Sequence, residues 1–148
     1  MNTPTAARLI QPYLFFEGRC EEALEFYRSA LGAETGMLMR YKDSPDPQAC
    51  AGPQAGEKIM HCSFRVGETE LFASDGRCSG QANHDGFSLS LTVPSADEAE
   101  RTFAALSEGG AITLPLTKTF FSDRVGMVSD KFGVPWMIIV PPTQSPLT

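Results

Sequence analysis

The feature that most constrains the fold is an internal repeat, in which a strand, a helix and three further strands follow one another twice along the chain. The two helical segments share a local motif: Ala23 is followed four residues later by Tyr27, and Ala99 is followed in the same way by Phe103. A pattern that recurs in this way indicates one structural unit used twice. We therefore predict an α+β fold built from two βαβββ modules.

The first module is predicted to span 8–76 and the second 86–141, within a single domain that covers 1–148. Each helix is marked by apolar residues at helical spacing and by acidic residues in its first turn. The second helix also opens with the capping-box pair Ser95 and Glu98. These end signals place one helix in each module.

The strands alternate between two rows of side chains, because successive residues of a strand point to opposite faces of the sheet. One row is predicted to pack on the helices, and the other is predicted to line a curved mixed-sheet cup. The helix row comprises Ile10, Leu14, Phe16, Cys62, Phe64, Val66, Leu71, Ala73, Phe87, Leu89, Leu91, Val93, Trp136 and Ile138. The cup row comprises Gln11, Tyr13, Phe15, His61, Ser63, Arg65, Glu70, Phe72, Ser74, Ser88, Ser90, Thr92, Met137 and Ile139.

Two segments are predicted to interrupt this regular pattern. Residues 42–58 are rich in Pro, Gly and Asp, which is typical of a long loop that serves as a lid or as a mobile excursion. Pro115 is predicted to break the strand-like segment that follows the second helix. Phe120 and Phe121, just beyond it, are expected in the core or at the rim of the cup.

Composition excludes several classes of function. The net charge of −6 and the lack of a Lys/Arg cluster argue against a nucleic-acid partner, because phosphate contacts dominate such binding. The longest apolar runs have the length of strands, so no membrane partner is expected. The first residues lack the apolar centre of a signal peptide, and Cys20, Cys50, Cys62 and Cys78 form no CxxC pair. We expect a cytoplasmic protein with reduced thiols.

The predicted cup has the makeup of a small-molecule site, with apolar walls and a few polar groups; the alternative is a sheet face that is open to water. His61 is a candidate general base near neutral pH or a metal ligand, and otherwise an ordinary surface residue. Glu70, the other catalytic candidate, could instead pair with Arg65 across the hairpin. Arg65 and Arg124, the latter predicted in a rim loop, could hold an anionic substrate.

Particular segments resemble a known family. They are PYLFFEGRCEEALEFYRSALG, LFASDG, FSLSLTV with DEAERTFAALSEGG, and DRVGMVSDKFGVPWMI, and they cover most of 9–140. These segments resemble the vicinal oxygen chelate superfamily of glyoxalases, bleomycin-resistance proteins and extradiol dioxygenases. Within it, the chain is similar to the PhnB-like branch, often labelled as demethylubiquinone methyltransferases. The resemblance implies a glyoxalase/bleomycin-resistance-like fold and a homodimer.

In this superfamily one residue from each of four strands holds a divalent metal, and the resemblance places these positions at Gln11, Glu70, Ser88 and Met137. Gln11 and Glu70 are acceptable oxygen donors for a metal. Ser88 and Met137 are poor ligands for a hard cation. The implied cofactor is therefore a divalent metal at a reduced site, or no metal.

Three hypotheses follow from the sequence. The first is a small-molecule-binding protein with a degenerate or absent metal site. The second is a divalent-metal-dependent lyase, isomerase or dioxygenase, with His61 as third ligand or base. The third is a dimer without a ligand. The residues predicted to bind the small molecule are Gln11, Tyr13, His61, Arg65, Glu70, Phe72, Ser88 and Met137.

Overall fold

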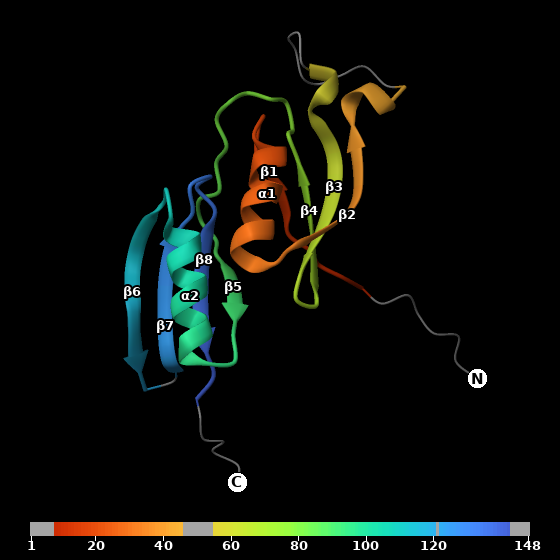
Figure 1. The fold of residues 1–148 in the computed structure, drawn as a ribbon. Helices are drawn as coiled ribbons and strands as arrows, with labels where there is room; N and C mark the ends of the chain where they lie inside the picture. The colour runs from red at the N-terminus through yellow and green to blue at the C-terminus, as the bar shows by residue number, and fades with distance from the viewer. Residues whose placement is uncertain (1–7, 46–54, 121, 143–148) are drawn as a thin grey trace, which may run out of the picture.

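The computed structural model describes residues 8–45, 55–120 and 122–142 and contains the βαβββ unit twice (Figure 1). The first module comprises β1 (Tyr13–Phe15), α1 (Cys20–Leu31), β2 (Glu34–Arg40), the short 3-10 turns η1 (Tyr41–Asp43) and η2 (Ala55–Glu57), β3 (Ile59–Val66) and β4 (Thr69–Ser74). The second comprises β5 (Leu89–Thr92), α2 (Ala96–Ser107), β6 (Ala111–Thr119), β7 (Ser122–Ser129) and β8 (Pro135–Val140). The predicted fold class is confirmed.

The two sheets share one topology. The first has the strand order β1-β4-β3-β2 and the second has the order β5-β8-β7-β6. In each sheet the first and last strands of the module pair in parallel, and the other pairs are antiparallel. The repeat in the sequence is therefore a repeat of connectivity, and β2 and β6 are equivalent edge strands.

Local sequence signals account for the start of α2 and for the end of α1. Ser95 caps α2, and its side chain accepts a hydrogen bond from the backbone N of Glu98 at 3.2 Å. Gly32 ends α1 in the left-handed conformation, with φ of 69°, which costs a residue without a Cβ little. The buried faces of the two helices carry Cys20, Ala23, Leu24 and Tyr27 in α1, and Ala99, Phe103 and Leu106 in α2.

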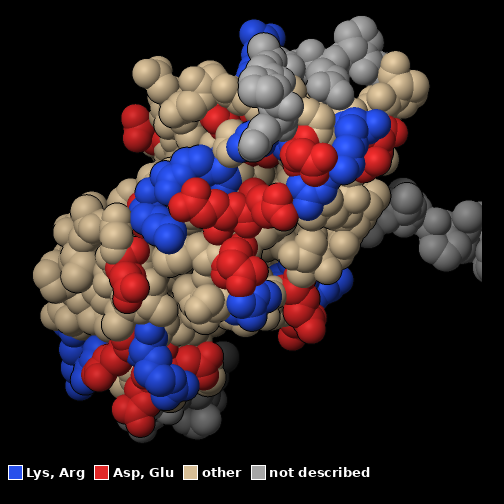
Figure 2. All heavy atoms as spheres, turned by 45° about the horizontal axis from the view of Figure 1, so that its top comes forward, with Lys and Arg blue, Asp and Glu red and all other residues tan. Residues whose placement is uncertain are grey.

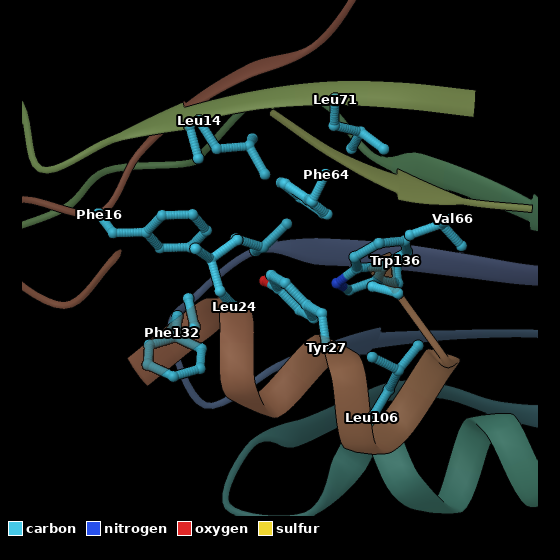
Figure 3. Close-up of a cluster of buried hydrophobic side chains, with 14 of the residues drawn as sticks. Leu14, Phe16, Leu24, Tyr27, Phe64, Val66, Leu71, Leu106, Phe132 and Trp136 are labelled. Atoms are coloured by element: carbon cyan, nitrogen blue, oxygen red, sulfur yellow. The ribbon is translucent and has the colours of Figure 1, made fainter. Parts of the chain in front are cut away.

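One hydrophobic core joins the two modules (Figure 3). Tyr27 of α1 stacks on Phe64 of the first sheet at 5.7 Å between ring centroids, and it meets Trp136 of the second sheet edge-on at 5.6 Å. The carboxylate of Asp130 accepts hydrogen bonds from the Tyr27 hydroxyl at 2.5 Å and from Trp136 Nε1 at 2.9 Å. Because the inner rows of both sheets contribute to this core, the opposite face of each sheet lies on its outside. We call these the outer faces.

Most of the predicted helix row is buried, but its first residue in each module is not. Ile10 is fully exposed and Phe87 is 43% exposed, because both precede the strands they were assigned to. In the cup row, Ser63 and Ser74 are buried rather than open. Phe120 is 98% exposed, which corrects the expectation of a core or rim position. The side chain of Phe121 lies outside the described residues.

Other irregularities also differ from expectation. Pro115 lies inside β6 and does not end it, since β6 is an edge strand with register shifts against β7. Cys20 and Cys62 are free thiols as expected, whereas Cys78 is disulfide-bonded. Of the predicted loop 42–58, residues 46–54 lie outside the described residues, so its role as a lid stays a prediction.

Basic and acidic side chains alternate over the face seen in Figure 2 and do not segregate by sign. Several form ion pairs, such as Arg40 with Glu21 at 3.0 Å and Lys42 with Glu57 at 2.8 Å. Within 8–45, 55–120 and 122–142, neither α1 nor α2 is long and apolar enough to cross a membrane.

Candidate ligand-binding site

Strand order brings three distant parts of the first module together on the outer face of its sheet. Parallel pairing of β1 with β4 places Tyr13 opposite Phe72. Antiparallel pairing of β3 with β4 places Ser63 opposite Phe72 and Arg65 opposite Glu70. Residues at alternate positions of these strands share one face, so most of the predicted binding residues of this module lie side by side.

Four rings form a continuous aromatic cluster on this face. Tyr13 stacks on Phe15 with 4.7 Å between ring centroids and lies 5.9 Å from Phe72. The His61 ring lies 5.4 Å from Tyr13 and 5.3 Å from Phe72. Tyr13 is 40% exposed and Phe15 is 47% exposed. Grouped aromatic rings that remain open to water are unusual on a protein surface unless they bind something.

A hydrogen bond joins the polar ends of two of these rings. The Tyr13 hydroxyl lies 2.8 Å from Nδ1 of His61. Partial burial raises the pKa of Tyr13, so its hydroxyl stays protonated at neutral pH. The neutral hydroxyl can donate to Nδ1 in one tautomer of His61 or accept from Nδ1–H in the other, so in either case the contact fixes the orientation of the imidazole ring.

Gln11 and Glu70 form the polar side of the cluster. Nε2 of Gln11 donates to the backbone oxygen of Glu70 at 3.1 Å and to its Oε1 at 3.2 Å. Arg65 donates to the backbone oxygen of Glu68 at 3.4 Å. Within the described ranges, no ion pair joins Arg65 to Glu70, so the carboxylate of Glu70 is held by Gln11 instead.

Two cavities border the cluster. One, of about 210 Å³, is lined by Glu34, Thr35, Gly36, Ser63, Phe64, Arg65 and Glu70. The other, of about 320 Å³, is lined by Ile10, Gln11, Pro12, Tyr13, Leu14, Phe87 and Leu89, and it reaches the second module. The sequence did not assign Glu34 and Thr35 to the site. Glu34 ends the helical pattern and Thr35 opens a segment that reads as a strand, but neither lies in an alternating run that would have marked an outer face.

The remaining predicted residues belong to the second module. Ser88 is exposed and lines a cleft of about 240 Å³ with Pro12 and Thr69. Met137 is half-buried on β8, opposite Ser90 of β5. Arg124 lies in β7, not in a rim loop, and its Nε is 3.8 Å from Oε2 of Glu100. The structure therefore gathers the first-module residues and leaves Ser88, Met137 and Arg124 outside the aromatic cluster.

The donor set does not fit a divalent cation. Gln11 directs its amide nitrogen, which is a hydrogen-bond donor, at the carboxylate of Glu70. In the part of the chain that the structure describes, no three residues among His, Cys, Asp and Glu are arranged to hold a metal. The thioether of Met137 is a soft ligand and does not suit a hard cation.

Two βαβββ modules with this strand order define the glyoxalase/bleomycin-resistance-like fold. The chain belongs to the family described as 3-demethylubiquinone-9 3-methyltransferase, whose model matches residues 8–139. It is 34% identical over 140 residues to Protein YjdN of Escherichia coli (strain K12), covering 88% of this chain and 94% of that protein. The resemblance to the PhnB-like branch is thereby confirmed.

Solved structures agree with this assignment. Protein PA1353 from Pseudomonas aeruginosa is 40% identical, with a TM-score of 0.79, over 91% of this chain and 98% of that one. The PhnB protein from Bacillus cereus, described as a putative 3-demethylubiquinone-9 3-methyltransferase, is 30% identical with a TM-score of 0.74, over 90% and 99%. A glyoxylase/bleomycin resistance protein/dioxygenase domain from Frankia sp. EAN1pec, 13% identical with a TM-score of 0.63 over 95% and 96%, shares the fold.

Proposed function

We propose that this protein binds a small molecule on the outer face of its first sheet, without needing a metal. The observation that carries the proposal is the open cluster of Tyr13, Phe15, His61 and Phe72, bordered by the Gln11–Glu70 pair. Such a surface offers flat apolar contact together with a few oriented polar groups, which is the usual makeup of a small-molecule site.

The chemistry of the face favours a flat, unsaturated ligand with polar substituents. Tyr13 and Phe72 supply ring surface for offset or edge contacts. His61 supplies a ring nitrogen whose orientation is set by Tyr13, and Arg65 supplies a charged donor at the far end of β3. Arg65 could bind a carboxylate or phosphonate.

We further propose that a second copy of the chain closes this face into a cup. The outer faces of both sheets point away from the shared core, so each presents an open half-site. Exposed apolar residues on the first sheet, such as Tyr13, Phe15 and Met37, would be covered in a dimer. Light scattering after size exclusion tests this, and a monomer at tens of micromolar would contradict it. A cytoplasmic location stays a prediction from the sequence.

The experiment for ligand binding is a thermal-shift screen with small aromatic carboxylates and phosphonates, since a ligand that binds the folded state raises the melting temperature. A compound that raises it should lose its effect in Tyr13→Ala and Phe72→Ala. The matched control is Phe120→Ala, which removes a ring that is 98% exposed and distant in sequence. Equal shifts in all three variants would contradict the proposed site. No shift with any compound would favour a dimer without a ligand.

The competing function, a divalent-metal-dependent lyase, isomerase or dioxygenase, is tested by metal content after purification without chelator. Titration with Mn²⁺, Ni²⁺ and Zn²⁺ while recording the melting temperature completes the test. A stoichiometric metal that is lost in Glu70→Ala and Gln11→Ala would overturn the metal-free proposal. Absence of metal and of any shift supports it.

A further inference from the structure

Two cysteines that are 42 positions apart in the sequence meet inside the first module. Sγ of Cys20, at the start of α1, lies 3.8 Å from Sγ of Cys62, in the middle of β3. Both side chains are fully buried, and both are free thiols. A disulfide bond is about 2.0 Å long, so the two sulfur atoms are within a small rearrangement of bonding distance.

A buried carboxylate holds the two elements that carry these thiols. Oδ1 of Asp75 accepts hydrogen bonds from the backbone N of Gly18 at 2.9 Å and of Cys20 at 2.7 Å. Oδ2 accepts from the backbone N of Ile59, the first residue of β3, at 2.7 Å. The start of α1 is thereby fixed against β3, so the spacing of the sulfur atoms is set by backbone contacts.

The two thiols are not equivalent. The hydrogen bond between the two thiols lowers the pKa of Cys62, although burial and the charge of Asp75 oppose this. The same hydrogen bond, together with burial, raises the pKa of Cys20. Because the thiolate is the nucleophile in thiol chemistry, the lower pKa favours Cys62 as the thiol that reacts first and Cys20 as the one that reacts second.

We propose that Cys20 and Cys62 form a site of reversible oxidation, at which a small hydroperoxide converts the two thiols into a disulfide. The Cys62 thiolate attacks one oxygen of hydrogen peroxide; the O–O bond breaks, leaving a sulfenic acid at Cys62 and a hydroxide that takes up a proton to become water. The sulfur of Cys20 then attacks that of Cys62, the S–S bond forms, and the hydroxyl group leaves with the proton of Cys20 as a second water.

In total, two thiols and one molecule of hydrogen peroxide give one disulfide and two molecules of water. A small thiol reverses it by exchange, with two molecules of that thiol leaving as their own disulfide. Burial suits a hydroperoxide, which is nearly as small as water, better than a bulky reagent. The inference does not depend on the proposed ligand site, although Cys62 lies next to His61 in β3.

The expected physical effect is a redox-dependent stability. The cross-link would close a loop across the 42 positions that separate the two cysteines. This removes conformational freedom from the unfolded chain, which should raise the melting temperature by roughly 10 °C. The rise should vanish on treatment with dithiothreitol.

Tryptic mapping tests the proposal directly, because each cysteine falls in its own tryptic peptide. The protein is treated with hydrogen peroxide, denatured, alkylated with iodoacetamide and digested. We expect a cross-linked pair of peptides 20–28 and 59–65 that separates on reduction. The double variant Cys50→Ser/Cys78→Ser isolates the buried pair, and it should keep both the cross-link and the rise in melting temperature.

Cys20→Ala is the matched control, since it keeps a small apolar side chain and removes the thiol that would attack the oxidised Cys62. It should show no rise in melting temperature with peroxide, and a sulfenic acid at Cys62 should be trapped by dimedone that is added together with the denaturant. If peptides 20–28 and 59–65 are instead recovered separately, each alkylated at its thiol, the proposal is wrong. This readout uses the wild-type chain, so it decides the matter even if Cys20→Ala does not fold.

Discussion

The hydroxyl of Tyr13 and Nδ1 of His61 lie 2.8 Å apart, a hydrogen bond that joins β1 to β3 across the intervening strand β4. It links side chains 48 positions apart and fixes the relative orientation of two rings of the aromatic cluster. The bond lies on the outer face, where no packing requirement of the core demands it. It therefore fixes how the imidazole ring of His61 is oriented relative to Tyr13 on this face.

The strength of this bond can be measured by a double-mutant cycle with Tyr13→Phe and His61→Phe. Each single change should cost about 0.5–1 kcal/mol in the free energy of unfolding, because a hydrogen bond contributes little net stability at a half-exposed site. The double change should cost less than the sum of the two, by up to about 1 kcal/mol. Urea unfolding provides the values. Strict additivity would mean that the two groups do not interact in solution.

His84 should make stability depend on pH. Its side chain is buried against Phe16 with 5.6 Å between ring centroids, and its Nε2 has no hydrogen-bond partner among the described residues. Burial lowers the pKa of His84, although the charges of Asp130 and Asp85 oppose this. Below a pH of about 6.5, His84 is therefore protonated in the unfolded chain but still neutral in the folded chain. Stability is full above this pH and is lost as the pH falls toward the folded pKa.

The measurement compares melting temperatures of wild-type protein and His84→Phe between pH 7.5 and pH 5. A folded-state pKa that is lower by one than the unfolded value corresponds to a loss of about 1.4 kcal/mol in the free energy of unfolding at low pH. The wild type should lose more stability than His84→Phe over this interval, because the acidic residues titrate alike in both. NMR titration of the two histidines, assigned with His61→Gln, should place His84 below the usual histidine range. Parallel pH profiles would contradict the prediction.

The sequence predicted the elements whose cause is local. Helix spacing and the Ser95 cap marked α1 and α2, and alternation placed Phe64 and Leu71 on the inner face. The predicted burial of Ile10 and Phe87 was wrong for one reason: the alternating pattern continues beyond the end of the paired strand, where these side chains stay exposed. The alternation of apolar and polar residues carries no information about where the strand begins to pair with its neighbour.

Pro115 shows a second limit. Proline interrupts a central strand but is tolerated at an edge, and edge position is a property of the sheet rather than of the segment. The pairing of Cys20 with Cys62 and of Tyr13 with His61 likewise depends on strand order. The alternating pattern placed Tyr13 and His61 on one face of the sheet. Their contact could not be predicted, because it depends on the strand order β1-β4-β3.

The Asp130 carboxylate should be among the most sensitive polar groups for stability. It is buried and accepts from Tyr27, from Trp136, and from the backbone N of Phe132 at 2.8 Å and Val134 at 3.1 Å. Asp130→Ala would leave these buried donors without an acceptor, at a cost of about 3–5 kcal/mol. Urea unfolding measures this loss. Tyr27→Phe, which removes one donor and keeps the ring, should cost only about 1–2 kcal/mol. Equal losses in the two variants would mean that the other three hydrogen bonds to Asp130 add no stability.

The capping contact of α2 gives a smaller and sharper test. The Ser95 side chain accepts from the backbone N of Glu98, which would otherwise lack a partner at the start of the helix. Ser95→Ala should therefore lower the free energy of unfolding by about 1 kcal/mol. The matched control is Ser107→Ala at the other end of α2, where the hydroxyl only donates to the backbone oxygen of Ala104. Because alanine favours the helix, that change should alter stability by less than about 0.5 kcal/mol. Similar losses in both variants would show that the cap does not stabilise α2.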